Sequence, residues 1–137
     1  MKRSHLLSSC LIALMGAAAL MPSARAATPA ELMAAYTAKA GTPASPERGK
    51  KLFMTNHGAD FGWSCSTCHT ENPAKTGKHA ISEKPIEPLA PSANAKRFTN
   101  ANKVELHFNT NCKDVVGREC TAGEKADVIS WLLTVKP

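Results

Sequence analysis

Two cysteines and a histidine stand together in the segment "SCSTCHT", where Cys65, Cys68 and His69 have the spacing C-x-x-C-H. This pattern is the attachment signature of c-type haem, because each thiol adds to a vinyl group of the porphyrin and the adjacent histidine reaches the iron from the same loop. We therefore predict one haem c per chain, held covalently by both cysteines, with His69 as the proximal ligand of the iron.

Two other kinds of site contain closely spaced cysteines. A thioredoxin-like dithiol needs a βαβ context, with its first cysteine at a helix start after a strand, and this chain shows little alternating β pattern. A zinc site needs a second pair of ligands, and Cys112 and Cys120 are spaced too widely for the usual zinc knuckle. The motif therefore favours haem over both alternatives.

The N-terminus predicts the compartment. Basic residues precede a short apolar run over residues 11–20, which is too short to span a bilayer, and Ala24 and Ala26 place small residues at the −3 and −1 positions of a cleavage site. We predict a secretory signal peptide over residues 1–26 and a single domain over residues 27–137. The mature protein is expected in the periplasm, where haem is attached covalently, and not embedded in the membrane.

The charge of the chain argues against nucleic acid as a partner. The net charge of +6 includes Lys2, Arg3 and Arg25, which leave with the signal peptide, and no cluster of basic residues or recognition motif remains. The mature chain is short and has few aromatic residues, so it can bury only a modest core, and a large apolar cofactor would supply the missing interior. A single short chain without an exposed heptad pattern is expected to be a monomer.

Helix signals predict a small all-α domain. Thr28 as N-cap, Pro29 at the first position and Gly41 as the stop define a first helix. Gly49 and Phe53 lie four apart, which permits a close crossing of the second helix with a helix that carries Trp131. Residues 70–93 hold several prolines without sustained periodicity and are expected to form a loop. The predicted helices cover residues 29–40, 46–56, about 100–111, and a last helix that opens with the capping box Thr121–Glu124 and ends before Pro137.

The distal ligand of the iron is the main question. Electron-carrying class I cytochromes use a methionine well downstream of the haem loop, but no methionine follows Cys68 here. The remaining candidates are His79, His107, Asn111, a lysine or no ligand, and His79 lies in a lysine-rich loop that is typical of a solvated surface. His107 and Asn111 are four apart on one predicted helix, and only one of them can bind. Imidazole is the stronger ligand, so chemistry alone favours His107 and a low-spin electron carrier.

The region from Leu89 to Leu132, together with "ERGKKLF" and "CSTCH", resembles the sphaeroides haem protein family, whose members are class I c-type cytochromes with an asparagine axial ligand. The most specific shared parts are "APSA", "RFT", "NC" followed by "GREC", and "GEKAD". The resemblance implies the class I cytochrome c fold. It also implies Asn111 as distal ligand and a disulfide between Cys112 and Cys120, while His107 stands where the family carries a tryptophan.

An asparagine ligand carries a functional expectation. An amide carbonyl is a hard, weak donor that suits ferric iron and loses its advantage on reduction, so the electron would free the site. The resemblance implies that small diatomic molecules (O2, NO or CO) then bind, with electrons supplied by a dihaem cytochrome c or another redox protein. Whether the protein is also an oxidoreductase acting on oxygen or nitrogen oxides stays open at this point. Further cofactor contacts are expected from Arg97, near the haem propionates, and from Phe98 and Phe108.

Overall fold

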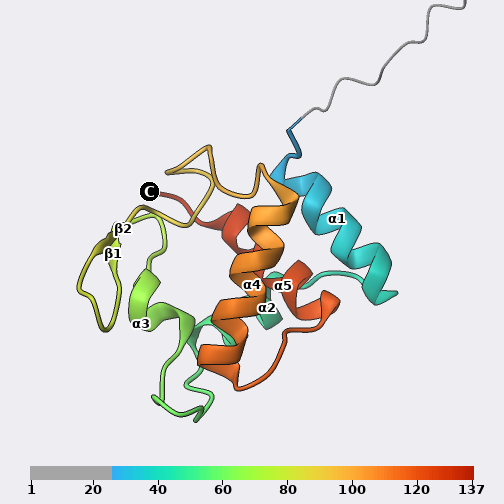
Figure 1. Ribbon diagram of the computed structural model, residues 1–137. Coiled ribbons are helices and arrows are strands. Elements are labelled where there is room, and N and C mark those ends of the chain that lie inside the picture. The colour runs from blue at the N-terminus through green and yellow to red at the C-terminus, as the bar shows by residue number, and fades with distance from the viewer. Residues whose placement is uncertain (1–25) are drawn as a thin grey trace, which may run out of the picture.

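The computed structural model describes residues 26–137, so the predicted signal peptide lies almost wholly outside the described residues. Within these residues, five helices and one pair of very short strands follow one another, and most of the remainder is loop (Figure 1). The prediction of an all-α domain is confirmed. None of the helices within residues 26–137 has the length and apolar character needed to cross a membrane. The elements are α1 (Pro29–Ala40), α2 (Pro46–Met54), α3 (Cys65–His69), β1 (Gly77–Lys78), β2 (Pro85–Ile86), α4 (Ala101–Val116) and α5 (Ala122–Thr134).

Helix α1 begins and ends where its capping residues predict. The Thr28 hydroxyl accepts a hydrogen bond from the Glu31 amide, and the Glu31 carboxylate accepts one from the Thr28 amide, which completes a capping box. Gly41 takes the left-handed conformation at φ 69° and donates its amide to the Thr37 carbonyl. The local sequence alone is therefore sufficient to place this helix.

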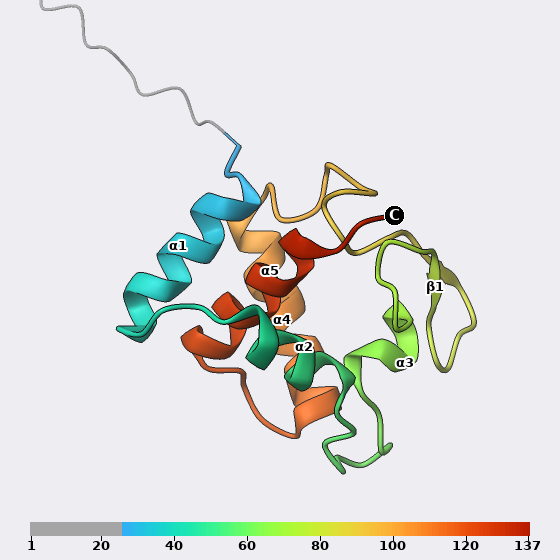
Figure 2. The ribbon, with the colours of Figure 1, turned by 180° about the vertical axis from the view of Figure 1, so that it is seen from behind.

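Helix α5 forms the centre of the core, with α1 and α2 packed against it (Figure 2). Every residue from Lys125 to Leu132 is buried, and Ile129 and Leu132 have no exposed surface. The predicted contact of Trp131 with α2 is confirmed, because its ring lies 4.8 Å from that of Phe53, centroid to centroid.

A buried carboxylate fastens the start of α2 to α5. Asp127 accepts hydrogen bonds from the Arg48 guanidinium at 2.8 Å through each of its oxygens, and from the Ser45 amide at 2.7 Å. Helix α2 ends at Met54, two residues earlier than predicted. The Asn56 side chain instead accepts from the Gly58 amide and donates to the Gly62 carbonyl, so it organises the loop that leads to α3.

Helix α4 is longer than the predicted span of about 100–111. It starts at Ala101, after the N-cap Asn100 and close to the predicted start, but continues to Val116 and is capped by Gly117, whose φ is 76°. The buried side chains of Cys112 and Val115 continue the inward face beyond Asn111, which explains the extra turn. Asn111 therefore lies within the helix and is not its C-cap.

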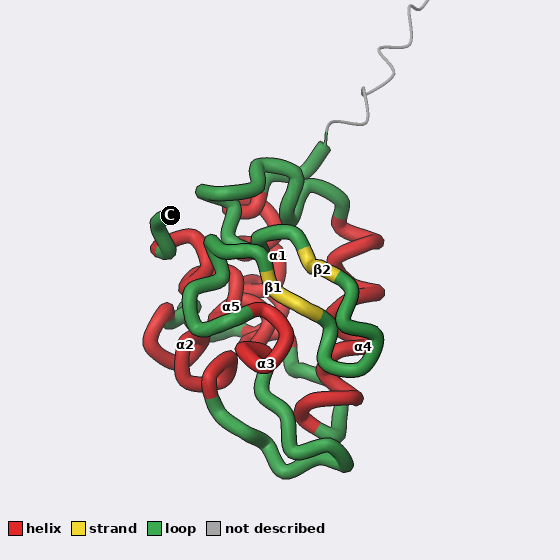
Figure 3. Tube along the Cα trace, turned by 90° about the vertical axis from the view of Figure 1, so that its left-hand side faces the viewer, coloured by secondary structure: helices red, strands yellow, loops and turns green. Residues whose placement is uncertain are grey.

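The predicted loop over residues 70–93 contains one small ordered element. Strands β1 and β2 pair antiparallel, with Gly77 opposite Ile86 and Lys78 opposite Pro85. Figure 3 shows this pair beside α3, on the side of the molecule where α3 and α4 are both seen. Two-residue strands are too short to give an alternating pattern in the sequence, so the prediction of a loop missed them.

Candidate functional site

The C-x-x-C-H motif forms the single turn of α3. The Ser64 amide donates to the Thr67 hydroxyl at 3.0 Å, and the Thr67 amide donates to the Ser64 carbonyl at 3.1 Å, which closes the turn. Cys65 and Cys68 are three residues apart and therefore share one face of it. Both carry free thiols and are half-buried. The two thiols thus have the spacing and the chemical form that thioether attachment requires.

Burial raises the pKa of the Cys65 thiol to about 11. A redox dithiol of the thioredoxin kind needs the opposite, a cysteine whose pKa is lowered so that a thiolate exists at neutral pH. The zinc alternative also loses its second pair of ligands, because Cys112 and Cys120 are bonded to each other. The structure therefore favours a haem loop over either rival.

His69 is half-buried beside the core. Its ring centroid is 6.2 Å from that of Phe53, which connects the motif to α2. Burial lowers the pKa of His69 to about 4, and the positive charges of Arg97 and His107 lower it further. The imidazole is consequently neutral at pH 7, with a nitrogen lone pair available to a metal.

The long loop after α3 is held against the motif by close backbone contacts. Gly77 lies directly against the Cys68 carbonyl, where a Cβ atom would overlap that oxygen. Pro73 is fully buried, and its carbonyl accepts from the amides of Leu89 and Ala90 at 2.8 and 2.9 Å. Sequence analysis did not identify Gly77 as a site residue, since a glycine in a lysine-rich loop gives no sign of which backbone it will meet.

Arg97 and Phe98 lie just before α4. The Arg97 side chain donates to the carbonyls of Pro88 and Glu87, at 2.9 and 2.6 Å, and burial lowers its pKa from the ordinary value. Phe98 is buried in the core cluster and has a φ of 58°, a conformation that non-glycine residues rarely adopt. Hydrogen bonds thus hold the Arg97 side chain, and core packing holds that of Phe98. The contacts of both residues with haem stay predictions.

Helix α4 carries the candidate distal ligands. His107 and Asn111 are one turn apart on the helix and both are exposed within the described chain. In Figure 1 the helix is seen beside α3, whose last residue is His69. Phe108, by contrast, packs edge-on against Tyr36 of α1, with ring centroids 6.1 Å apart. A contact between Phe108 and haem therefore also stays a prediction.

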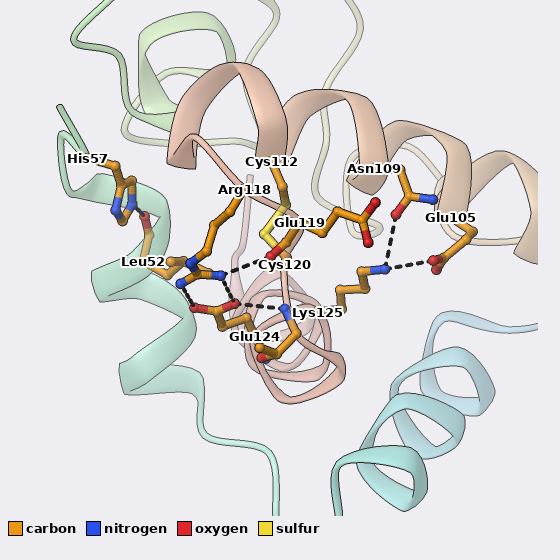
Figure 4. Close-up of a disulfide and its surroundings, with 11 residues drawn as sticks. Leu52, His57, Glu105, Asn109, Cys112, Arg118, Glu119, Cys120, Glu124 and Lys125 are labelled. Carbon is orange, nitrogen blue, oxygen red and sulfur yellow. Dashed lines mark hydrogen bonds and ion pairs between the residues drawn. A yellow bond between two sulfur atoms is a disulfide. The ribbon is translucent and has the colours of Figure 1, made fainter. Parts of the chain in front are cut away.

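The disulfide that the resemblance implied is present. Cys112 and Cys120 are bonded, their Cα atoms are 5.7 Å apart, and both side chains are buried (Figure 4). The bridge joins α4, one residue after Asn111, to the segment that immediately precedes α5. It therefore fixes the C-terminal part of α4 relative to the central helix.

Comparison with known proteins identifies the family. A family model described as "Domain of unknown function (DUF1924)" matches residues 39–132. Cytochrome c-type protein SHP of Cereibacter sphaeroides is 46% identical over 107 residues, which cover 77% of this chain and 82% of that protein.

Two solved structures have the same fold. The structure of oxidised SHP, described as an oxygen-binding cytochrome c, has a TM-score of 0.74 and 45% identity, and the match covers 78% of this chain and 96% of that one. The solution structure of Methylophilus methylotrophus cytochrome c'', which concerns haem-ligand detachment, has a TM-score of 0.71 and 38% identity, and the match covers 80% and 94% of the two chains. The cofactor of such a protein is haem c, one per chain. The chain belongs to the sphaeroides haem protein family of class I c-type cytochromes.

Proposed function

We propose that this protein is a monohaem cytochrome that binds small diatomic gases, namely O2, NO or CO, at a site opened by reduction. In this proposal Cys65 and Cys68 attach the haem and the neutral imidazole of His69 is the proximal ligand. When bound, the haem would supply a redox-active iron, which His69 would hold from the side of α3. The support from this chain is the single turn of α3, which places Cys65 and Cys68 beside His69, a half-buried imidazole that is neutral at pH 7.

The single observation that carries the proposal is the identity of the distal candidates. No methionine follows Cys68, so the helix α4 offers an amide and an imidazole in place of a thioether. We assign the distal position in the ferric protein to Asn111. Its carbonyl oxygen is a hard and weak donor, which favours ferric over ferrous iron, so Asn111 dissociates on reduction. The freed side chain can then donate a hydrogen bond from its NH2 group to a gas molecule in the site.

The relatives support a gas-binding role with a detachable ligand. Oxidised SHP is described as an oxygen-binding cytochrome c, and cytochrome c'' as a protein in which a haem ligand detaches. Within the proposal, electrons come from a dihaem cytochrome c or another redox protein, and the mature domain of residues 27–137 works as a periplasmic monomer. Determining the N-terminus of the exported protein tests the processing step, which should leave Ala27 as the first residue.

A second candidate function rests on a specific observation. His107 precedes Asn111 by one turn of α4 and is exposed like it, so the helix offers an imidazole beside the amide. If His107 were the distal ligand, the protein would be a low-spin cytochrome that carries electrons and leaves no position for a gas. His107 is thus the alternative distal ligand. Oxidoreductase activity toward oxygen or nitrogen oxides belongs to the first candidate only, because it requires a free position at the iron.

Two matched variants separate these functions. Optical and EPR spectra of the ferric protein are recorded for the parent, Asn111→Ala and His107→Ala, and CO is added to each after reduction. Gas binding through Asn111 predicts a ferric spectrum altered by Asn111→Ala and unaltered by His107→Ala, with a high-spin ferrous parent that takes up CO readily. The electron carrier would instead be established by a ferrous parent that is six-coordinate and low-spin and does not bind CO. In that case only His107→Ala would alter the ferric spectrum.

A further inference from the structure

A buried lysine lies at the centre of the contact between α1, α4 and α5. The Lys125 side chain, in the first turn of α5, is only 8% exposed. Its ammonium group donates to the Glu105 carboxylate at 2.7 Å and to the Asn109 side-chain oxygen at 3.4 Å (Figure 4). It also lies 5.6 Å from the ring centroid of Tyr36 and 5.9 Å from that of Phe108.

This group of contacts connects three helices. The Tyr36 hydroxyl of α1 donates to the second oxygen of Glu105 at 2.6 Å, so the carboxylate of α4 is held from α1 and α5 together. Burying the charge of a lysine costs free energy unless the ammonium group is paired and hydrogen-bonded. Most lysines avoid this cost because they are solvated at the surface. The position of Lys125 is therefore specified by α4, since two of its contacts are polar side chains of that helix.

The contacts of α4 with α5 lie along one side of the helix. Glu105 and Asn109 are one turn apart and bind Lys125, while Cys112, further along the same side, is bonded to Cys120 just before α5. At about 100° per residue, Asn111 points about 160° away from Asn109, about 120° from Glu105 and about 100° from Cys112 around the helix axis. The contacts with α5 thus hold one side of α4, and the candidate iron ligand projects away from that side.

We propose that Lys125 is a positioning residue for the distal ligand: by holding Glu105 and Asn109, it sets the rotation of α4 about its axis and so the reach of Asn111. Side-chain ends lie about 5 to 6 Å from a helix axis, so a rotation of about 10° moves them by about 1 Å. A shift of this size weakens the bond of a weak ligand, such as an amide, to iron more than it weakens that of a strong ligand. This inference rests on the proposed function, because it takes Asn111 to be the ligand of the ferric iron.

A merely structural role for Lys125 predicts a different set of results. In that case its removal lowers stability and leaves the ferric site unchanged once the protein is folded. The positioning role predicts that Asn111 competes less well for the ferric iron. An added ligand such as imidazole, which must displace Asn111, then binds more tightly to the ferric protein. Affinity for CO in the ferrous protein stays the same, since Asn111 has already left.

The experiment compares Lys125→Met with Lys113→Met in the complete haem-loaded protein. Methionine fills similar space without a charge, and Lys113 is the matched control because its pair with Glu119 is also near the disulfide but is more than half exposed. We expect imidazole to bind ferric Lys125→Met at least fivefold more tightly than the parent, with a change below twofold for Lys113→Met. The CO affinity of the ferrous protein is expected to change by less than twofold in both.

Combination with Asn111→Ala shows whether Lys125 acts through the ligand. Asn111→Ala alone should tighten imidazole binding, and adding Lys125→Met should give no further gain, because the competing ligand is already absent. A folded Lys125→Met with the imidazole affinity of the parent overturns the positioning role while leaving the ligand assignment intact. An Asn111→Ala variant with the parent's affinity overturns both. If Lys125→Met does not fold, Glu105→Gln, which keeps the shape of the partner, is measured in the same way with the same criteria.

Discussion

Gly49 of α2 lies directly against the main-chain carbonyl of Asp127 in α5, so closely that a Cβ atom at Gly49 would overlap the Asp127 oxygen. The obstacle is backbone, which cannot move aside as a flexible side chain can. Gly49→Ala therefore has to push the two helices apart and is expected to lower the free energy of unfolding by about 3 kcal/mol or more, the upper end of the range for overpacking. Urea unfolding of the haem-loaded protein measures the loss.

The control for that substitution is Gly123→Ala, on α5 itself. A Cβ atom there meets its nearest neighbour, the Ala40 Cβ, at an ordinary 3.7 Å. Alanine also favours a helix over glycine, so we expect no loss or a gain of up to about 1 kcal/mol. Equal effects of the two substitutions would show that helix propensity, and not the close crossing, governs these positions.

Gly77 is expected to matter for haem incorporation more than for the helical core. Its contact is the Cys68 carbonyl, so a side chain at this position has to displace the turn that carries both thiols and His69. Gly77→Ala should reduce the fraction of exported protein that carries covalent haem, which the ratio of haem absorbance to protein measures. The neighbouring exposed residue Lys78 provides the control, since Lys78→Ala should leave that fraction unchanged.

A pH dependence is expected from Glu124, the capping-box residue of α5. Hydrogen bonding from Arg118 lowers the pKa of Glu124 from 4.5 to about 2. Because the folded value lies below the unfolded one, the ionised carboxylate stabilises the protein in full above pH 4.5, and this contribution disappears as the pH falls toward 2. Arg118→Gln should lower the free energy of unfolding by about 1 kcal/mol at pH 7, and by progressively less toward pH 2.

The control for the acid experiment is the exposed pair Lys113 and Glu119, in which both side chains are more than half exposed. Lys113→Gln is expected to change the free energy of unfolding by no more than about 0.5 kcal/mol at any of these pH values. A constant difference between Arg118→Gln and the parent from pH 7 to pH 2 would contradict the assignment of the effect to Glu124.

Local signals predicted those parts of the fold that neighbouring residues determine. Thr28, Pro29 and Gly41 define α1 completely, and the four-residue spacing of Gly49 and Phe53 anticipated the crossing with α5. Helix α4 was predicted too short, because polar residues around Asn111 interrupt its apolar pattern. Its true end is marked by Gly117, which takes the left-handed conformation.

Contacts between distant parts of the chain could not be predicted in this way. Tyr36 and Glu105 are 69 residues apart, and nothing near Lys125 in the sequence distinguishes it from a solvated lysine. Gly77 likewise meets Cys68 only through the tertiary fold. The resemblance did supply one long-range feature, the pairing of Cys112 with Cys120. Periodicity and caps thus place the elements, whereas the site depends on how they are brought together.

The disulfide should make a measurable contribution to stability through the short ring that it closes. Cys112 and Cys120 are eight residues apart, and the loss of chain entropy for a ring of this size corresponds to about 2 to 3 kcal/mol. The double variant Cys112→Ser and Cys120→Ser should lose more than that amount in urea unfolding. Both cysteines are buried, so unpaired hydroxyls add to the loss, and the Cys112→Ala, Cys120→Ala pair isolates the entropic part. A loss below about 1 kcal/mol in the alanine pair would mean that the segment between the cysteines is already ordered by other contacts, such as those of Arg118 with Glu124.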